Sequence, residues 1–197
     1  MWQTLCEHFF SRFVRSSDTV VDVGAGYCEF INHIRAARKI AIDPNPDVRK
    51  FAMPGIEILN EPCTRLGSLD SNFADVVFMS NFLEHLASKD LVFAALAEAK
   101  RILKPGGKVM ILQPNIRFLA GAYWDFFDHL TPLTDRSLAE ALENLDMRID
   151  VLIPRFLPYT TKSRLPQGSI FVRLYLAIPL AWRFLGKQAF VVATKRD

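Results

Sequence analysis

The chain has 197 residues, of which half are apolar and 23% are charged. It is too apolar for a disordered chain and too mixed in composition for a membrane channel. A chain of this length can bury roughly 70% of the surface that its unfolded state exposes, without a disulfide or a metal. We therefore expect a single domain over residues 1–197.

The three cysteines are Cys6, Cys28 and Cys63. Their odd number and wide spacing argue against a disulfide framework and against a zinc site, so we expect no metal and a reducing compartment. The first 14 residues lack the pattern of a signal peptide, and no stretch is long and uncharged enough for a transmembrane helix. These features predict a cytoplasmic protein, with a location at the periphery of a membrane as the second option.

The N-terminal half of the sequence alternates between helical and extended patterns. Apolar residues at helical spacing predict an amphipathic N-terminal helix over residues 1–15. Residues 19–23 then predict a strand that ends at a glycine turn, and a second helix follows the turn. Two further short strands are predicted at 39–43 and 56–59.

The C-terminal half continues this alternation. Ser88 can cap a helix that ends before Pro105. The other predicted elements are strands at 75–79, 109–112, 149–153 and 190–193 and a helix at 134–145. Strands that are apolar on both faces and alternate with helices indicate an α/β fold, a doubly wound and mostly parallel sheet covered by helices on both faces.

Informative residues follow the first two strands. Gly24 and Gly26 allow a tight turn and a close approach of the backbone to a ligand, and Asp43 lies 19 residues after Gly24. At that interval a carboxylate can accept hydrogen bonds from both ribose hydroxyls of a nucleoside. The spacing therefore predicts a nucleoside cofactor at the carboxyl ends of the strands.

A nicotinamide dinucleotide is the alternative cofactor. Its pyrophosphate needs a helix N-terminus that opens with GxGxxG, and here Glu29 occupies the third glycine position. A carboxylate beside the phosphates is unfavourable, whereas S-adenosylmethionine carries no phosphate. The sequence therefore favours the sulfonium cofactor.

Four motifs in this order resemble the class I S-adenosylmethionine-dependent methyltransferases of the small, single-domain type, and the resemblance spans residues 19–113. The motifs are Val20–Gly26, Ala41–Asn45, Phe73–Leu86 and Ile102–Val109. The resemblance implies a Rossmann-like sheet of seven strands, with the run from Phe190 to Ala193 inserted antiparallel. It also implies S-adenosyl-L-methionine as the cofactor and methyl transfer as the reaction.

The same resemblance assigns the cofactor-binding residues. Gly24 and Gly26 approach the methionine moiety, Asp43 holds the ribose, and Ser80 lies beside the methionine amine. The full expected set is Asp22, Gly24, Ala25, Gly26, Asp43, Pro44, Ser80 and Asn81. The chain departs from the family pattern at Cys28, where a glycine is common, and it offers only Glu61 or Cys63 near the position that contacts adenine.

The segment from Tyr123 to Thr131 follows the fifth strand on the acceptor side. His129 lies near two carboxylates and has a side chain suited to proton transfer near neutral pH, so it is a candidate base or acceptor contact. Most rings of the segment are expected to pack over the sheet, and Tyr123 is expected to contact the acceptor. His85 belongs to the fourth-strand motif and is interpreted as a helix-start residue.

The last fifth of the chain is basic. Residues 155–187 contain six Lys/Arg, no Asp/Glu and a broken apolar run. Three interpretations stay open: helices that cover a sheet edge, a cap over the acceptor, or contact with a membrane surface. As a cap, Lys162 and Arg164 would bind an anionic group of the acceptor.

We therefore predict an enzyme, an S-adenosylmethionine-dependent methyltransferase that acts on a small molecule, anionic and partly apolar. No nucleic-acid partner is expected, because the basic segment lacks interleaved stacking residues. The alternative is a catalytically silent methyltransferase-like domain that binds the cofactor or serves as an interaction module.

Overall fold

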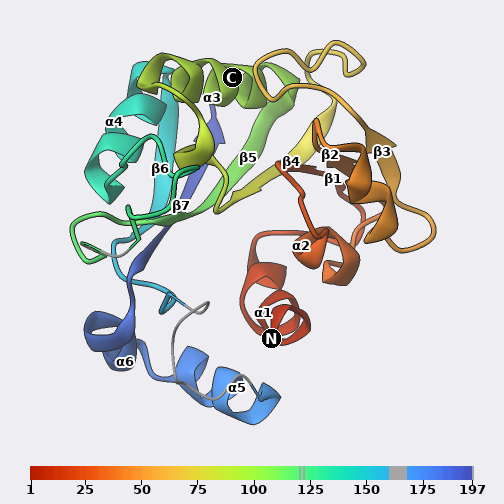
Figure 1. Cartoon of the computed structure of the whole chain (residues 1–197). Coiled ribbons are helices and arrows are strands. Elements are labelled where there is room, and N and C mark those ends of the chain that lie inside the picture. Colours follow the sequence, from red (N-terminus) through yellow and green to blue (C-terminus); the bar gives the residue numbers. More distant parts are fainter. Residues whose placement is uncertain (120, 122, 160–167, 197) are drawn as a thin grey trace.

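A computed structural model of the chain describes residues 1–119, 121, 123–159 and 168–196. Its centre is a sheet of seven strands in the order β3-β2-β1-β4-β5-β7-β6 (Figure 1). The strands are β1 Thr19–Val23, β2 Arg38–Ile42, β3 Glu57–Leu59, β4 Ala74–Ser80, β5 Leu103–Pro114, β6 Met147–Ile153 and β7 Gln188–Lys195. Strand β7 pairs antiparallel with β5 and with β6, and the pairs among β1 to β5 are parallel. The predicted fold class and the inserted antiparallel strand are confirmed.

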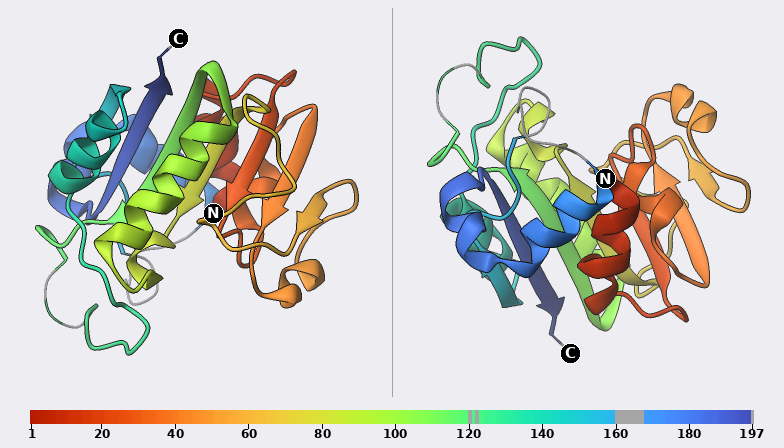
Figure 2. Two further views of the ribbon diagram at one scale, coloured as in Figure 1. Left: turned by 90° about the horizontal axis from the view of Figure 1, so that it is seen from above. Right: turned by 90° about the horizontal axis from the view of Figure 1, so that it is seen from below.

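Helices cover both faces of this sheet. They are α1 Trp2–His8, α2 Glu29–His33, α3 Lys89–Ile102, α4 Asp135–Asn144, α5 Ser169–Ala177 and α6 Pro179–Leu185, with short 3-10 helices at Phe10–Arg12, Pro46–Lys50 and Leu83–His85. One core cluster contains the buried side of α3 and α4, and the other contains that of α1, α2 and α5. The two views of Figure 2 show α3 in front of the sheet on one face and α1 with α5 on the other.

The first helix is shorter than the sequence predicts. Helix α1 ends at His8, Phe9 adopts φ −130° and ψ −59°, and a 3-10 turn follows. Neighbouring residues of an α-helix point about 100° apart, yet Phe9 and Phe10 are both buried. Phe9 stacks on Phe156 at a ring distance of 4.2 Å, and Phe10 contacts Phe78 at 5.4 Å. The break lets both rings enter the same core.

Polar side chains cap the N-termini of α3 and α4. Ser88 Oγ accepts a hydrogen bond from the Leu91 amide at 3.2 Å, so Ser88 caps α3 as predicted. Helix α4 begins with a capping box formed by Thr134 and Ser137. Such caps satisfy backbone donors that the first helical turn leaves free.

Cys6, Cys28 and Cys63 are buried free thiols. Burial raises the pKa of Cys6 to about 12 and that of Cys28 to about 11, so both stay protonated. Within the part of the chain that the structure describes, no helix has the length and apolar character needed to cross a membrane.

Candidate functional site

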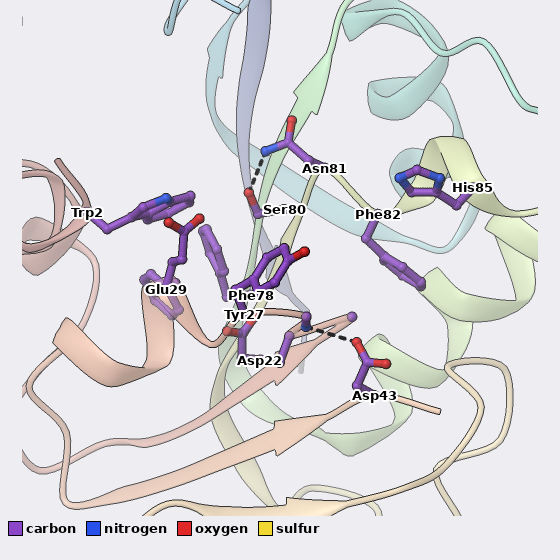
Figure 3. A pocket seen from close by; sticks show the side chains of 14 residues that line it. Trp2, Asp22, Tyr27, Glu29, Asp43, Phe78, Ser80, Asn81, Phe82 and His85 are labelled. Atoms are coloured by element: carbon purple, nitrogen blue, oxygen red, sulfur yellow. Dashed lines mark hydrogen bonds between the residues drawn. The ribbon is translucent and has the colours of Figure 1, made fainter. Parts of the chain in front are cut away.

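The turn after β1 and the end of β2 are joined by a hydrogen bond. Gly24 and Gly26 adopt φ values of +72° and +49°. The Gly26 amide donates to Asp43 Oδ2 at 2.9 Å (Figure 3). The other oxygen of Asp43 accepts from the Asn45 amide at 2.9 Å. The carboxylate therefore holds the glycine turn against β2, as its place at the strand end allows.

The two glycines meet different surroundings. A Cβ atom at Gly24 would lie 2.4 Å from Cγ of Phe82, whereas a Cβ at Gly26 would meet nothing within 4 Å. The sequence predicts that a ligand lies close to both glycines, but at Gly24 the close neighbour is the Phe82 ring of the protein itself. Gly26 leaves an open cradle that a side chain would partly fill, and this observation fits a bound nucleoside cofactor.

This cradle is part of a pocket formed at the carboxyl ends of β1, β2 and β4 (Figure 3). Seven of the eight predicted cofactor residues line it, namely Asp22, Gly24, Ala25, Gly26, Asp43, Ser80 and Asn81. Asn81 Nδ2 donates to Ser80 Oγ at 3.0 Å. Pro44 is exposed and is not among the lining residues. The assignment of cofactor contacts to these residues stays a prediction.

The candidates for the purine end lie outside this lining. Glu61 accepts hydrogen bonds from the hydroxyl and the amide of Ser68. Cys63 is a buried thiol of the core. Glu29, in contrast, is exposed and lines the pocket, and a carboxylate there disfavours the pyrophosphate of a dinucleotide.

Asp22 places a buried carboxyl group on the floor of the pocket. It is 3% exposed, and burial raises its pKa to about 8, opposed by the Ile31 amide and supported by the charge of Asp43. A group with this pKa is mostly protonated at pH 7. A cationic ligand group nearby would favour its ionised form, which suits a cofactor that carries sulfonium and ammonium charges.

We expect the binding of S-adenosylmethionine to release close to one proton from Asp22 at pH 7. Because the pKa of Asp22 is raised to about 8, the carboxyl group must lose its proton when its ionised form binds the cofactor. The affinity for the cofactor should then rise about tenfold per pH unit below pH 8 and level off above it. Calorimetry in two buffers of different ionisation enthalpy measures the proton count. The variant Asp22→Asn is the control. Its amide cannot release a proton, so any proton that it releases on binding comes from the amine of the cofactor. Equal proton counts for the two proteins would contradict this role.

A second pocket adjoins the first. The two share Trp2, Tyr27, Glu29, Asn81 and His85 in their walls. The other residues that line the second pocket are Met1, Leu5, Glu84, Leu112, Tyr123, His129, Leu157, Pro158, Tyr159 and Gln188. This pocket is mostly apolar with a few polar groups, as small-molecule sites are.

The backbone determines which ring nitrogen of His129 is free. Nδ1 of His129 lies 2.6 Å from the carbonyl oxygen of Tyr123. A carbonyl only accepts hydrogen bonds, so Nδ1 carries the proton and Nε2 of the neutral ring can accept one. The ring stacks on that of Tyr123 at 4.0 Å, which fixes its orientation.

His85 lies beside His129, which sequence reasoning did not anticipate. It ends the 3-10 helix Leu83–His85 rather than starting a helix, and its ring is 5.1 Å from that of His129. The Asp128 carboxylate contacts His85 Nδ1 at 3.3 Å. Ligand-capable atoms of His85, Asp128 and His129 lie within 4.8 Å of one another. The expectation that the chain binds no metal stays a prediction.

Glu84 was also missed, and it holds the loop that carries His129. Its side chain is fully buried and accepts hydrogen bonds from the Tyr123 hydroxyl and from Gln113 Nε2. Its carbonyl oxygen accepts from the amides of Leu130 and Thr131. Burial and the charge of Glu84 raise the pKa of Tyr123 far above its usual value. Tyr123 therefore presents its ring to the pocket, while its hydroxyl is bound to Glu84.

The predicted anion contacts Lys162 and Arg164 lie outside the residues that the structure describes. Among the described lining residues of the second pocket, none is a lysine or an arginine. The carboxylic acids among these described lining residues are Glu29 and Glu84.

Comparisons with known proteins indicate a methyltransferase domain. The family model described as a methyltransferase domain matches residues 21–111. An uncharacterised methyltransferase of Schizosaccharomyces pombe is 30% identical over 134 residues, which are 58% of this chain and 47% of that protein. The chain thus spans about half the length of this curated relative.

Solved structures share the fold. The methyltransferase bound to the activator Trm112 of Haloferax volcanii superimposes with a TM-score of 0.75 at 19% identity, covering 100% of this chain and 90% of that chain. A SAM-dependent methyltransferase of Archaeoglobus fulgidus gives a TM-score of 0.67 at 22% identity, covering 94% of this chain and 90% of that chain. Residues 21–111 thus match a methyltransferase domain, and the strand order together with these solved structures shows that the chain has the fold of S-adenosylmethionine-dependent methyltransferases.

Proposed function

We propose that this protein transfers a methyl group from S-adenosylmethionine to an O–H or N–H group of a small, partly apolar molecule. The observation that carries the proposal is the pocket beside the cofactor site, where Nε2 of His129 is free to accept a proton. The two pockets share a wall, so a cofactor in the first and an acceptor in the second would lie next to each other.

The chain's own residues account for binding and proton transfer. The cofactor supplies an activated methyl group, and the displacement needs the acceptor atom in line with it. His129 Nε2 would take the proton that the acceptor loses. Glu84 acts as a positioning residue, because it holds Tyr123 and the backbone of the loop around His129.

Gln188 supports an acceptor with a hydrogen-bond donor. It lines the second pocket and is 5% exposed, and its Oε1 has no partner among the described residues. A buried amide oxygen without a partner is costly. A hydroxyl or amine of the acceptor would satisfy it.

The anionic portion of the acceptor stays a prediction, as does the absence of a nucleic-acid partner. The described pocket residues support only the apolar portion, through Leu5, Leu112 and Leu157. A catalytically silent interaction module is less favoured, because both pockets are formed and the candidate base faces the second one. One structural neighbour is a methyltransferase bound to an activator protein, and a partner of this kind for the present chain would be compatible with activity.

We expect His129→Ala to lower turnover roughly 100-fold or more, the usual contribution of a general base, while cofactor affinity is unchanged. Mass spectrometry of the products formed from a panel of phenols, quinols, amines and lipids would first identify the acceptor. His33→Ala is the matched control, since His33 lines a separate cavity. Partial rescue by imidazole would support proton transfer. A loss below threefold would show that His129 is not the base, without affecting the assignment of the cofactor site.

A further inference from the structure

Helices α5 and α6 are anchored to the molecule on one side. Leu176 is buried in the core cluster that also contains Leu5 and Phe9 of the N-terminal segment. Trp182 Nε1 donates to the carbonyl oxygen of Tyr175 at 2.8 Å, which ties the two helices together. Figures 1 and 2 show α5 beside α1 on the same face of the sheet. These helices therefore have a defined inner side.

The outer side of the same helices is also apolar. Ile170, Leu174 and Ile178 recur at intervals of four residues and are 76%, 57% and 44% exposed. We call the exposed large apolar side chains of the two helices, together with Ile178 between them, the α5–α6 surface; they are Ile170, Phe171, Leu174, Ile178, Leu180, Phe184 and Leu185. A helix that is apolar on both sides is usually buried on both, and contiguous exposed apolar patches of this kind mark interaction sites.

The charged residues of the segment that carries this surface are all basic. Arg173, Arg183 and Lys187 are exposed, and none of the three forms an ion pair with another described residue. No Asp or Glu occurs anywhere in residues 155–187. Arg155 instead binds the end of α6, where its guanidinium donates hydrogen bonds to the carbonyl oxygens of Phe184 and Gly186.

We propose that the α5–α6 surface docks on an anionic lipid membrane. Apolar side chains flanked by arginine and lysine match the acyl and headgroup layers of such a membrane, where each basic residue near the surface strengthens binding about fivefold. Two copies of this chain would instead bring cations against cations, which opposes self-association. A nucleic acid would leave the aliphatic side chains without an apolar partner.

The proposal does not depend on methyl transfer. It would, however, place a membrane next to the second pocket, because α5 contacts α1 and Trp2 and Leu5 of α1 line that pocket. A partly apolar acceptor dissolved in the bilayer would then have a short path to the site.

Co-sedimentation with vesicles tests the proposal on the whole chain without any acceptor. We expect binding to phosphatidylcholine vesicles that contain one quarter phosphatidylglycerol, at least about fivefold weaker binding to pure phosphatidylcholine, and weaker binding at 0.5 M than at 0.1 M salt. The double variant Phe171→Ser/Phe184→Ser should bind the vesicles at least about tenfold more weakly. The double variant Arg173→Gln/Arg183→Gln should lose a similar factor in affinity, but only on anionic vesicles.

Phe93→Ser is the matched control. Phe93 is 40% exposed on α3, on the opposite face of the sheet, and its replacement should leave vesicle binding unchanged. Thermal unfolding and cofactor binding verify that each variant is folded. Failure of the folded wild-type chain to bind anionic vesicles, or equal binding by the double phenylalanine variant, would overturn the proposal. So would a dimer in sedimentation velocity that this double variant dissociates, since the surface would then serve a second copy.

Discussion

Replacing Asp43 with alanine is expected to weaken the binding of S-adenosylmethionine roughly 100-fold. Each hydrogen bond from a ribose hydroxyl to a carboxylate contributes about 1.5 kcal/mol, and the variant loses two of them. It also loses the contact to the Gly26 amide that holds the glycine turn against β2. Isothermal calorimetry with the cofactor and with its demethylated product measures the change.

The nearby Asp47→Ala is the matched control for this prediction. Asp47 follows the same strand, is exposed, and its carboxylate contacts only Lys50 among the described residues, at 2.8 Å. Its loss should leave affinity within about twofold, because exposed ion pairs of this kind contribute little. Unfolding curves without ligand separate binding from stability. An unchanged affinity in folded Asp43→Ala would show that the ribose lies elsewhere.

The order of strands and helices was predictable because most strands contain a short apolar run with a turn residue close to one end. Strand β1 ends directly before Gly24 and β2 ends directly before Asp43 and Pro44, and both features are local in sequence. The break in the first helix was not predictable from periodicity. It depends on the rings of Phe78 and Phe156, which reach the N-terminal segment only in the folded chain.

The cofactor pocket and the second pocket also differ in how far the sequence predicts them. The residues predicted to bind the cofactor belong to motifs that follow strand ends, so their meeting at one edge of the sheet follows from a parallel sheet. The second pocket depends on contacts between distant positions, such as the Tyr123 hydroxyl on Glu84, 39 residues apart. The packing of Phe82 against Gly24 is another such contact. The spacing of residues along a single sequence does not reveal such contacts.

Gly26→Val is the clearest test of the glycine cradle. Its Cβ would meet no protein atom, so the cost to the fold is limited to the positive φ of +49°, about 1–2 kcal/mol. Gly24→Val would not separate the two effects, because its Cβ would collide with Phe82. We therefore expect Gly26→Val to stay folded and to bind the cofactor at least roughly 100-fold more weakly, since a branched side chain would occupy the place where the ligand meets the backbone.

Gly55→Val is the matched control for this last variant, because Gly55 also has a positive φ, +88°, and its Cβ would also meet nothing within 4 Å. Gly55 is not among the residues that line the cofactor pocket. The two variants should therefore lose similar stability in chemical unfolding, while only Gly26→Val loses affinity in calorimetry. If both variants bind the cofactor as the wild type does, the ligand does not approach the turn at Gly26. If both lose affinity together, backbone strain rather than contact with the ligand explains the loss.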